Sequence, residues 1–170
     1  LVIVATSFSV NETDGLDGLA GGVLLSSFLA YGMISFLQGK YDLAVFSSVI
    51  VGALFAFLWF NIFPAVLIMG DTGAVSLGVT LAVVAILSNA PFLLPIVGII
   101  FVVESFSVLL QIFWRKVLKK KLFLSTPLHH HLEAKKWPEP KIVMRLWIIS
   151  LQFAAVGAAL FLMDRYLGIT

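Results

Sequence analysis

Long stretches of this chain carry no charged side chain, and they constrain its fold more than any other feature of the sequence. From Thr72 to Val103, 32 consecutive residues are uncharged. A helix rises about 1.5 Å per residue, so about 20 apolar residues cross a hydrocarbon core of ~30 Å. Only 12% of the residues are charged, against roughly a quarter in a soluble domain, and the mean hydropathy is +1.08. The sequence therefore predicts an all-α membrane protein, a polytopic transmembrane helix bundle.

Five stretches are predicted to be complete spans. Asn89-Ala90-Pro91 divides the longest uncharged run, because proline lacks an amide donor and disfavours helix before it. In the first span, the Gly21-Gly22 pair predicts close contact with a neighbouring helix. Residues 1–10 are too short to cross and lack the charged start of a signal peptide, so we expect them to end a helix that begins upstream, in a single membrane domain over 1–170. The predicted spans are 19–37, 43–62, 74–88, 92–114 and 142–163.

Basic residues indicate which side of the membrane each loop faces. Nine of the eleven Lys and Arg residues lie in the segment 115–145, and loops rich in these residues face the cytoplasm. With the loop 115–141 inside, the alternation of spans puts loops 11–18 and 63–73 on the same side. The run Lys119–Lys121 also has a simpler interpretation, as an anchor to anionic lipid headgroups. Three polar clusters therefore share the predicted cytoplasmic face.

The first cluster covers residues 11–18 (NETDGLDG), where one helix ends and the next begins. Asp14 and Asp17 are three residues apart, so a helical turn would direct both carboxylates to one ligand. The alternative is an ordinary interfacial turn whose aspartates cap a helix.

The second cluster joins Asn61 to the segment Met69–Ala74 (MGDTGA), which opens the next span. Glycines let backbone amides approach an anion, a helix N-terminus favours negative charge, and Asp71 can hold Mg²⁺ against the anion's oxygens. The cluster is typical of a metal-diphosphate site. The alternative is a glycine-rich turn in which Asp71 only caps the helix.

The third cluster covers residues 125–133 (STPLHHHLE). Thr126-Pro127 predicts the start of a helix, which places His129 and His130 in the first turn, where a phosphate can be held or a proton moved. Three consecutive histidines point in different directions on a helix, which makes a three-ligand zinc site geometrically poor. The alternative is a polar loop facing headgroups.

Glu104 is an isolated acid inside a predicted span. Such acids usually face a partner or a cavity, because unpaired charge in hydrocarbon is expensive. We expect its partner to lie in a part of the protein outside this sequence.

The three clusters, in this order and separated by these spans, closely resemble the phospho-N-acetylmuramoyl-pentapeptide transferases of the polyprenyl-phosphate N-acetylhexosamine-1-phosphate transferase superfamily. The similarity extends over essentially the whole chain and corresponds to the C-terminal half of that family. The matching stretches are 11–20 (NETDGLDGLA), 57–78 (FLWFNIFPAVLIMGDTGAVSLG) and 126–150 (TPLHHHLEAKKWPEPKIVMRLWIIS).

The resemblance implies a Mg²⁺-dependent enzyme that transfers phospho-MurNAc-pentapeptide from UDP-MurNAc-pentapeptide to undecaprenyl phosphate, giving lipid I and UMP. It implies a multi-pass protein of the bacterial plasma membrane with a cytoplasmic active site, partners in both substrates and the lipid bilayer, and no nucleic acid; a homodimer is left open. By this resemblance Asp71 is the metal ligand, the catalytic residues are Asp14, Asp71, His129 and His130, and the substrate-binding residues are Asn11, Thr13, Asp17, Asn61 and His131.

This chain also departs from the family pattern. Ile68 replaces a common Phe that stacks on uracil, Ala74 replaces a Ser, and Lys136 replaces a Gly. The family's adjacent-aspartate motif belongs to the N-terminal half, and no Asp-Asp pair occurs in these 170 residues. We therefore expect these residues alone to be inactive.

Three other functions are alternatives. A GlcNAc-1-phosphate transferase of the teichoic-acid or O-antigen type is the nearest, although residues 126–133 favour the muramoyl enzyme. Half of a secondary transporter is another, because broken helices mark transport sites, but here the polar clusters lie at span ends and no internal repeat is evident. The third is a subunit that binds nucleotide without turnover.

Overall fold

The computed structural model describes residues 1–167, and these residues form helices and loops with no strand. The prediction of an all-α bundle is confirmed. Four helices are long and apolar enough to cross a membrane, or up to five if one bent pair counts as a span. The elements are α1 (Val2–Thr13), α2 (Leu19–Leu37), α3 (Tyr41–Asn61), α4 (Gly70–Leu87), η1 (Pro91–Leu93), α5 (Leu94–Val97), α6 (Ile99–Leu118), α7 (Leu128–Ala134) and α8 (Glu139–Leu167).

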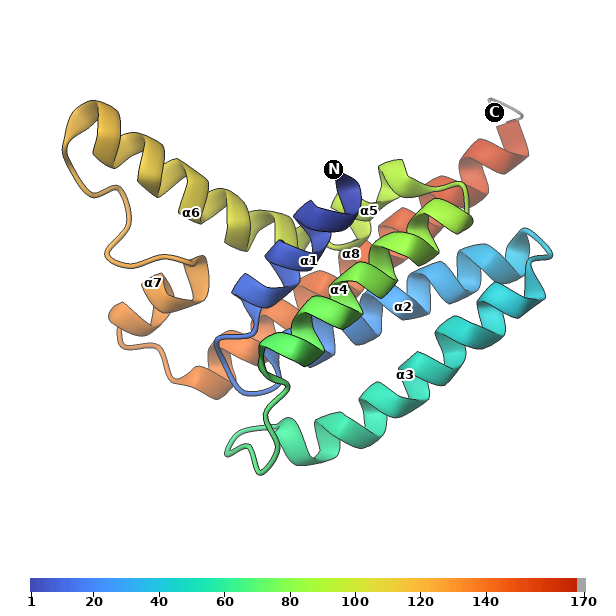
Figure 1. The fold of residues 1–170 in the computed structure, drawn as a ribbon, viewed down its shortest axis with the longest axis horizontal. Helices are drawn as coiled ribbons and strands as arrows, with labels where there is room; N and C mark the ends of the chain where they lie inside the picture. Colours follow the sequence, from blue (N-terminus) through green and yellow to red (C-terminus); the bar gives the residue numbers. More distant parts are fainter. Residues whose placement is uncertain (168–170) are drawn as a thin grey trace.

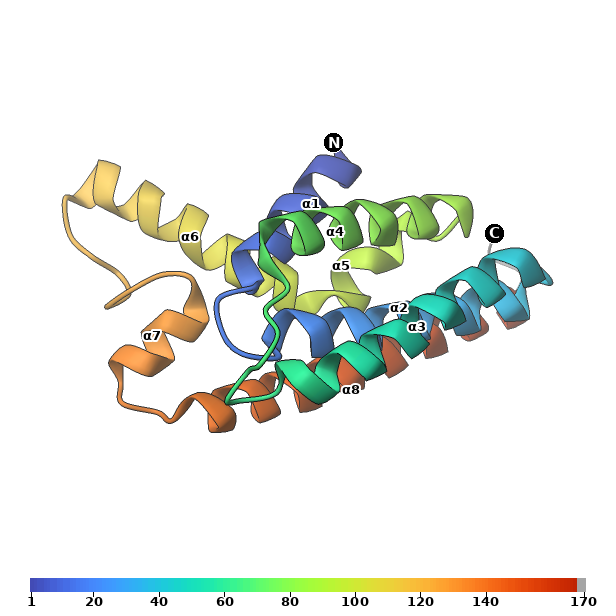
Figure 2. The same ribbon diagram turned by 60° about the horizontal axis from the view of Figure 1, so that its bottom comes forward.

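Helix α2 is the centre of the bundle. In its apolar window 67% of the residues are buried, against 28% in the windows of α3 and α8, the two helices that flank it. Helices α1 and α4 pack on each other in a second layer above α2, α3 and α8 (Figures 1 and 2). The faces of α3 and α8 that point away from α2 carry exposed large apolar side chains, as expected where a helix meets lipid.

The Gly21-Gly22 pair marks the close contacts of α2, as the sequence predicted. A Cβ atom added at Gly22 would lie 2.1 Å from Nε1 of Trp147 on α8, and one added at Gly21 would lie 2.9 Å from a methyl carbon of Leu58 on α3. The indole of Trp147 also donates a hydrogen bond of 3.0 Å to the carbonyl of Gly18, at the start of α2. Glycine is therefore what allows both neighbours to reach the α2 backbone.

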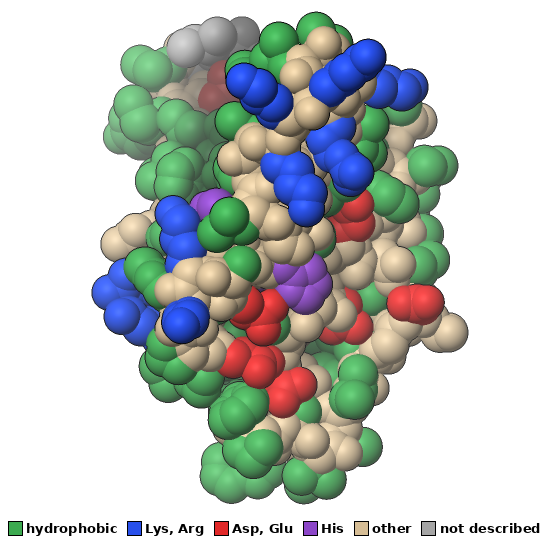
Figure 3. Space-filling model, turned by 90° about the vertical axis from the view of Figure 1, so that its left-hand side faces the viewer, with side chains coloured by type: hydrophobic (Ala, Val, Ile, Leu, Met, Phe, Trp, Pro, Cys, Tyr) green, Lys and Arg blue, Asp and Glu red, His purple; other side chains and the backbone are tan. Residues whose placement is uncertain are grey.

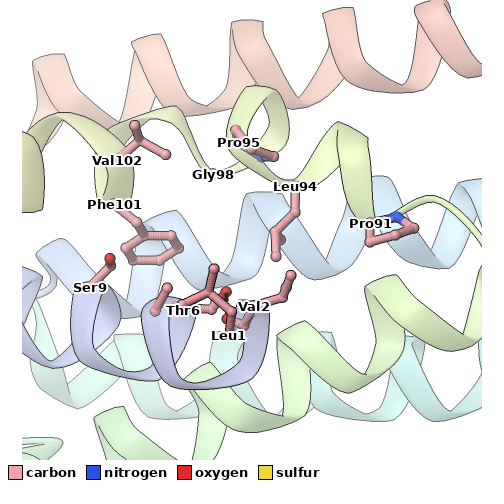
Figure 4. A pocket seen from close by; sticks show the side chains of 11 residues that line it. Leu1, Val2, Thr6, Ser9, Pro91, Leu94, Pro95, Gly98, Phe101 and Val102 are labelled. Atoms are coloured by element: carbon pink, nitrogen blue, oxygen red, sulfur yellow. Dashed lines mark hydrogen bonds between the residues drawn. The ribbon is translucent and has the colours of Figure 1, made fainter.

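The helix predicted over 92–114 is broken in the structure. The segment Pro91–Val97 meets α6 at an angle of 80°. Pro95 lies in the first turn of α5, where its missing N–H costs nothing, and the short helix ends at Gly98. The bend leaves a groove of about 250 Å³ between α1 and the α5–α6 corner, lined mainly by apolar side chains such as Val2, Leu94 and Phe101 (Figure 4).

The three polar clusters lie at one end of the bundle. This end joins the α1–α2 loop, the α3–α4 loop, and the segment from the end of α6 through α7 to the start of α8 (Figure 1). Seen from this end, acidic side chains gather beside a histidine, and Lys and Arg side chains border them (Figure 3). Segments far apart in the sequence therefore share one polar face.

Candidate active site

Asp14 connects the first two clusters. Its carboxyl group follows the last turn of α1 and accepts a hydrogen bond from the backbone N–H of Gly70, at the start of α4. Burial raises the pKa of Asp14 above 3.8, the Gly70 hydrogen bond lowers it, and the nearby charge of Asp71 raises it further. Asp14 and Asp71, 57 residues apart in sequence, are thus electrostatic neighbours at the start of α4.

Asp17 and Asn61 hold the loop between α3 and α4. The Asp17 carboxylate accepts a hydrogen bond of 2.9 Å from the N–H of Ala65, and the Asn61 side-chain amide donates one of 2.7 Å to the carbonyl of Leu67. The loop then carries apolar side chains in the open, with Val66 79% and Ile68 78% exposed. Both of these predicted substrate-binding residues therefore shape this loop through direct contacts.

Helix α8 anchors the α1–α2 loop. The Glu139 carboxylate, in the first turn of α8, accepts a hydrogen bond of 2.8 Å from the backbone N–H of Asp17. Together with the Trp147 bond to Gly18, it fixes the α1–α2 loop from the other side. The sequence did not indicate this role for Glu139, because the two residues are 122 positions apart.

His129 is fully buried and connects the third cluster to the first. Its backbone N–H and its ring Nδ1 both contact Oε2 of Glu104 on α6, at 3.2 and 3.1 Å. The other side of the ring faces the α1–α2 loop, where a Cβ added at Gly15 would lie 2.4 Å from Nε2. The expectation that the partner of Glu104 lies outside this sequence is wrong, because the partner is His129.

His130 and His131 point in other directions. His130 Nδ1 lies 2.6 Å from Glu133 Oε2 in a partly exposed pair, and its ring packs against that of His129 with centroids 4.3 Å apart. His131 Nδ1 accepts a hydrogen bond from the N–H of Leu124, so it fastens the loop before α7. Of the three imidazoles, those of His129 and His130 lie together.

Thr13 and Asn11 occupy the last turn of α1. The Thr13 side chain is fully buried and its hydroxyl donates to the carbonyl of Ser9, so the structure does not bring it to the open face. Asn11 is partly buried, and its side-chain oxygen has no hydrogen-bond partner among the described residues. Asn11 is therefore the one of the two with an unused polar atom.

The acidic pair has the right chemistry for Mg²⁺. Magnesium prefers oxygen ligands and is usually held by one or two carboxylates together with substrate phosphates. Asp71 is exposed in the first turn of α4, and Asp14 adjoins it. Within residues 1–167 no group of three or more His, Asp or Glu side chains is arranged to hold a metal by protein ligands alone. The residues present therefore fit a metal shared with a phosphate ligand.

Comparisons with known proteins point to one family. The family model described as "Glycosyl transferase family 4" matches residues 1–89. A phospho-N-acetylmuramoyl-pentapeptide-transferase of Rubrobacter xylanophilus is 42% identical over 97% of this chain and 50% of its own length. Those of Gluconacetobacter diazotrophicus and Neisseria gonorrhoeae are 44% and 43% identical over 93% and 92% of this chain, and 48% of their own lengths. The chain thus spans about half the length of these relatives.

Proposed function

Because the chain belongs to glycosyl transferase family 4, we propose that it forms part of a Mg²⁺-dependent phospho-N-acetylmuramoyl-pentapeptide transferase. The protein would transfer phospho-MurNAc-pentapeptide from UDP-MurNAc-pentapeptide to undecaprenyl phosphate, with UMP as the leaving group, at the cytoplasmic face of a bacterial plasma membrane. The observation that carries this proposal is that Asp71 lies beside Asp14 and that His129 packs against Gly15, the next residue of the same loop. The names of the relatives supply the substrate class.

The reaction is a substitution at phosphorus. An oxygen of the lipid phosphate bonds to the β phosphorus of the nucleotide, and the bond from that phosphorus to the bridging oxygen breaks. The electron pair leaves with the bridging oxygen, which gives lipid I and UMP. The protein has little covalent chemistry to do, so its residues act by positioning and by stabilising charge.

The acidic pair would serve the diphosphate. Mg²⁺ held by Asp71, with Asp14 beside it, would neutralise negative charge on the transferring group. Asp14 also accepts the Gly70 N–H, which orders the start of α4 beside Asp71. The carboxylate of Asp71 is therefore presented on an ordered backbone instead of a free loop.

The remaining residues would orient the substrate. Asp17 and Asn61 hold the α3–α4 loop, and we assign that loop to the nucleoside, with Ile68 as an exposed apolar contact for the base. His130, which is partly exposed, would bind a phosphate oxygen. The residues of this chain alone are expected to be inactive, because the family's adjacent-aspartate motif, which belongs to its N-terminal half, does not occur in them.

The proposal is tested with the full-length protein in membrane vesicles. UDP-MurNAc-pentapeptide or UDP-GlcNAc is supplied with undecaprenyl phosphate, and the lipid product and UMP are measured. Lipid I is the expected product; GlcNAc-diphosphoprenol would establish the neighbouring transferase class and refute the muramoyl assignment.

A substitution tests the magnesium residue in the same assay. Asp71→Asn keeps the shape of the side chain and removes its charge, and we expect transfer to fall at least about 100-fold. Asp42→Asn makes the same chemical change in the first turn of α3, at the opposite end of the bundle, and serves as the control. Full activity of Asp71→Asn would remove this residue from the metal site.

A further inference from the structure

Glu104 and His129 form a buried polar pair with spare hydrogen-bonding capacity. Both residues are 0% exposed, and Glu104 lies in the interior of α6. Yet Glu104 Oε1 and His129 Nε2 have no hydrogen-bond partner among the described residues. An apolar pair of similar volume would pack here without these unpaired atoms, which cost free energy in a low-dielectric interior. Packing alone therefore does not account for the pair.

The geometry of the pair sets which ring nitrogen carries the proton. Glu104 Oε2 accepts a hydrogen bond from the backbone N–H of His129. The ring Nδ1 contacts the same oxygen, and this contact is favourable only when Nδ1 carries a proton and donates it. A neutral imidazole has one N–H. Nε2 is then left with a free lone pair, and it is the buried atom without a partner.

The free nitrogen faces a position kept open by glycine. Any side chain at Gly15 would begin 2.4 Å from Nε2. Gly15 itself is exposed and follows Asp14, which adjoins Asp71. The ring therefore packs directly against Gly15, in the loop that carries Asp14.

This inference rests on the proposed function. We infer that Glu104 is a positioning residue that orients His129, so that Nε2 can accept the proton of a P–O–H group on the attacking lipid phosphate. When the phosphate oxygen attacks, its proton passes to Nε2, and the imidazolium that forms is paired with the Glu104 carboxylate. The carboxylate keeps its own charge throughout. This is the arrangement by which a buried acid orients a catalytic histidine in other enzymes.

The first test reads the tautomer directly. The full-length protein is labelled with ¹⁵N-histidine, and the His129 signal is assigned by its loss in His129→Gln. Wild-type protein should show a protonated Nδ1 and an unprotonated Nε2. A proton on Nε2 in the wild type would overturn the inference, whatever the substrate turns out to be.

The second test removes the charge at constant size. In Glu104→Gln the amide oxygen can still accept the backbone N–H of His129, but the negative charge that pairs with the imidazolium is lost, so we expect kcat to fall about 100-fold or more with KM changed only a few-fold. A wild-type kcat in Glu104→Gln, or an equal loss of kcat in the control Asp42→Asn at the opposite end of the bundle, would refute the positioning role. Failure of lipid I synthesis in the wild type would instead refute the proposed function, and the kcat of whatever transfer occurs would still test Glu104.

The third test acts from the other side of the ring and remains decisive if Glu104→Gln fails to fold. Gly15→Ala puts a methyl group against Nε2 while leaving Glu104 in place. We expect kcat to fall at least about 10-fold with the Nδ1 proton retained. Gly52→Ala is the matched control, because Gly52 is exposed and a Cβ there meets nothing within 4 Å. Unchanged activity of Gly15→Ala would refute the inference.

Discussion

The contact between Gly22 on α2 and Trp147 on α8 makes a quantitative prediction about the bundle. In Gly22→Ala the new methyl carbon would lie 2.1 to 2.7 Å from three atoms of the Trp147 indole, so the ring must move. Overpacking of this kind costs about 1–3 kcal/mol, and loss of the indole bond to Gly18 costs about 1 kcal/mol more. Alanine returns about 0.5–1 kcal/mol of helix propensity. The expected net loss is about 2 kcal/mol of unfolding free energy.

The assay is unfolding by denaturing detergent in mixed micelles, followed by Trp fluorescence and helicity. Gly52→Ala should instead be neutral or gain up to about 1 kcal/mol, because its Cβ enters open space. In a Trp147→Ala background, Gly22→Ala should no longer destabilise, so the double-mutant cycle isolates the clash. If Gly22→Ala behaves like Gly52→Ala, the close packing of α2 on α8 is refuted.

Three further predictions concern the polar face. Burial raises the pKa of Asp14, so its charged form destabilises the folded state at pH 7. Asp14→Asn should therefore raise the thermal midpoint of unfolding in magnesium-free buffer. This gain should shrink as pH falls through the raised pKa toward 3.8, where Asp14 becomes protonated in both states. A constant gain across that range would contradict it. Asp17→Ala removes the acceptor of the Ala65 N–H, so KM for the nucleotide substrate should rise about 10-fold. Asp17→Asn keeps an acceptor oxygen and should raise KM less. Wild-type KM values in both variants would show that the α3–α4 loop does not bind the nucleoside. Chelation of Mg²⁺ should stop transfer and added Mg²⁺ restore it, and a chelator-resistant rate would refute the metal proposal.

The sequence predicted the helical spans well where apolar composition alone sets them. Helices α2 and α3 lie within a residue or two of the predicted 19–37 and 43–62. The prediction failed to foresee the sharp bend at Gly98, because an uncharged apolar run is equally compatible with a straight helix and a broken one. Helix α4 also begins at Gly70, four residues before the predicted 74, because its first turn is polar.

For the candidate site too, the sequence predicted some features and missed others. Asp14, Asp71 and His129 were singled out by residue type and spacing, and the structure brings them to one end of the bundle. Asp17 and Asn61 were singled out too, but their contacts with the α3–α4 loop could not be foreseen. The sequence predicted Glu104 to be an isolated acid inside a span with its partner outside this sequence, whereas the structure pairs it with His129.

By itself the sequence determined that this is a helical membrane protein with its polar residues gathered at the ends of spans, because hydrocarbon excludes unpaired charge wherever the helices happen to pack. Only the tertiary structure decided which polar groups meet. The pairing of Glu104 with His129 and the anchoring of Asp17 by Glu139 depend on how each helix is rotated and how far it slides against its neighbours. Those two quantities are set by side-chain packing across residues that are distant in sequence, and no local pattern records them.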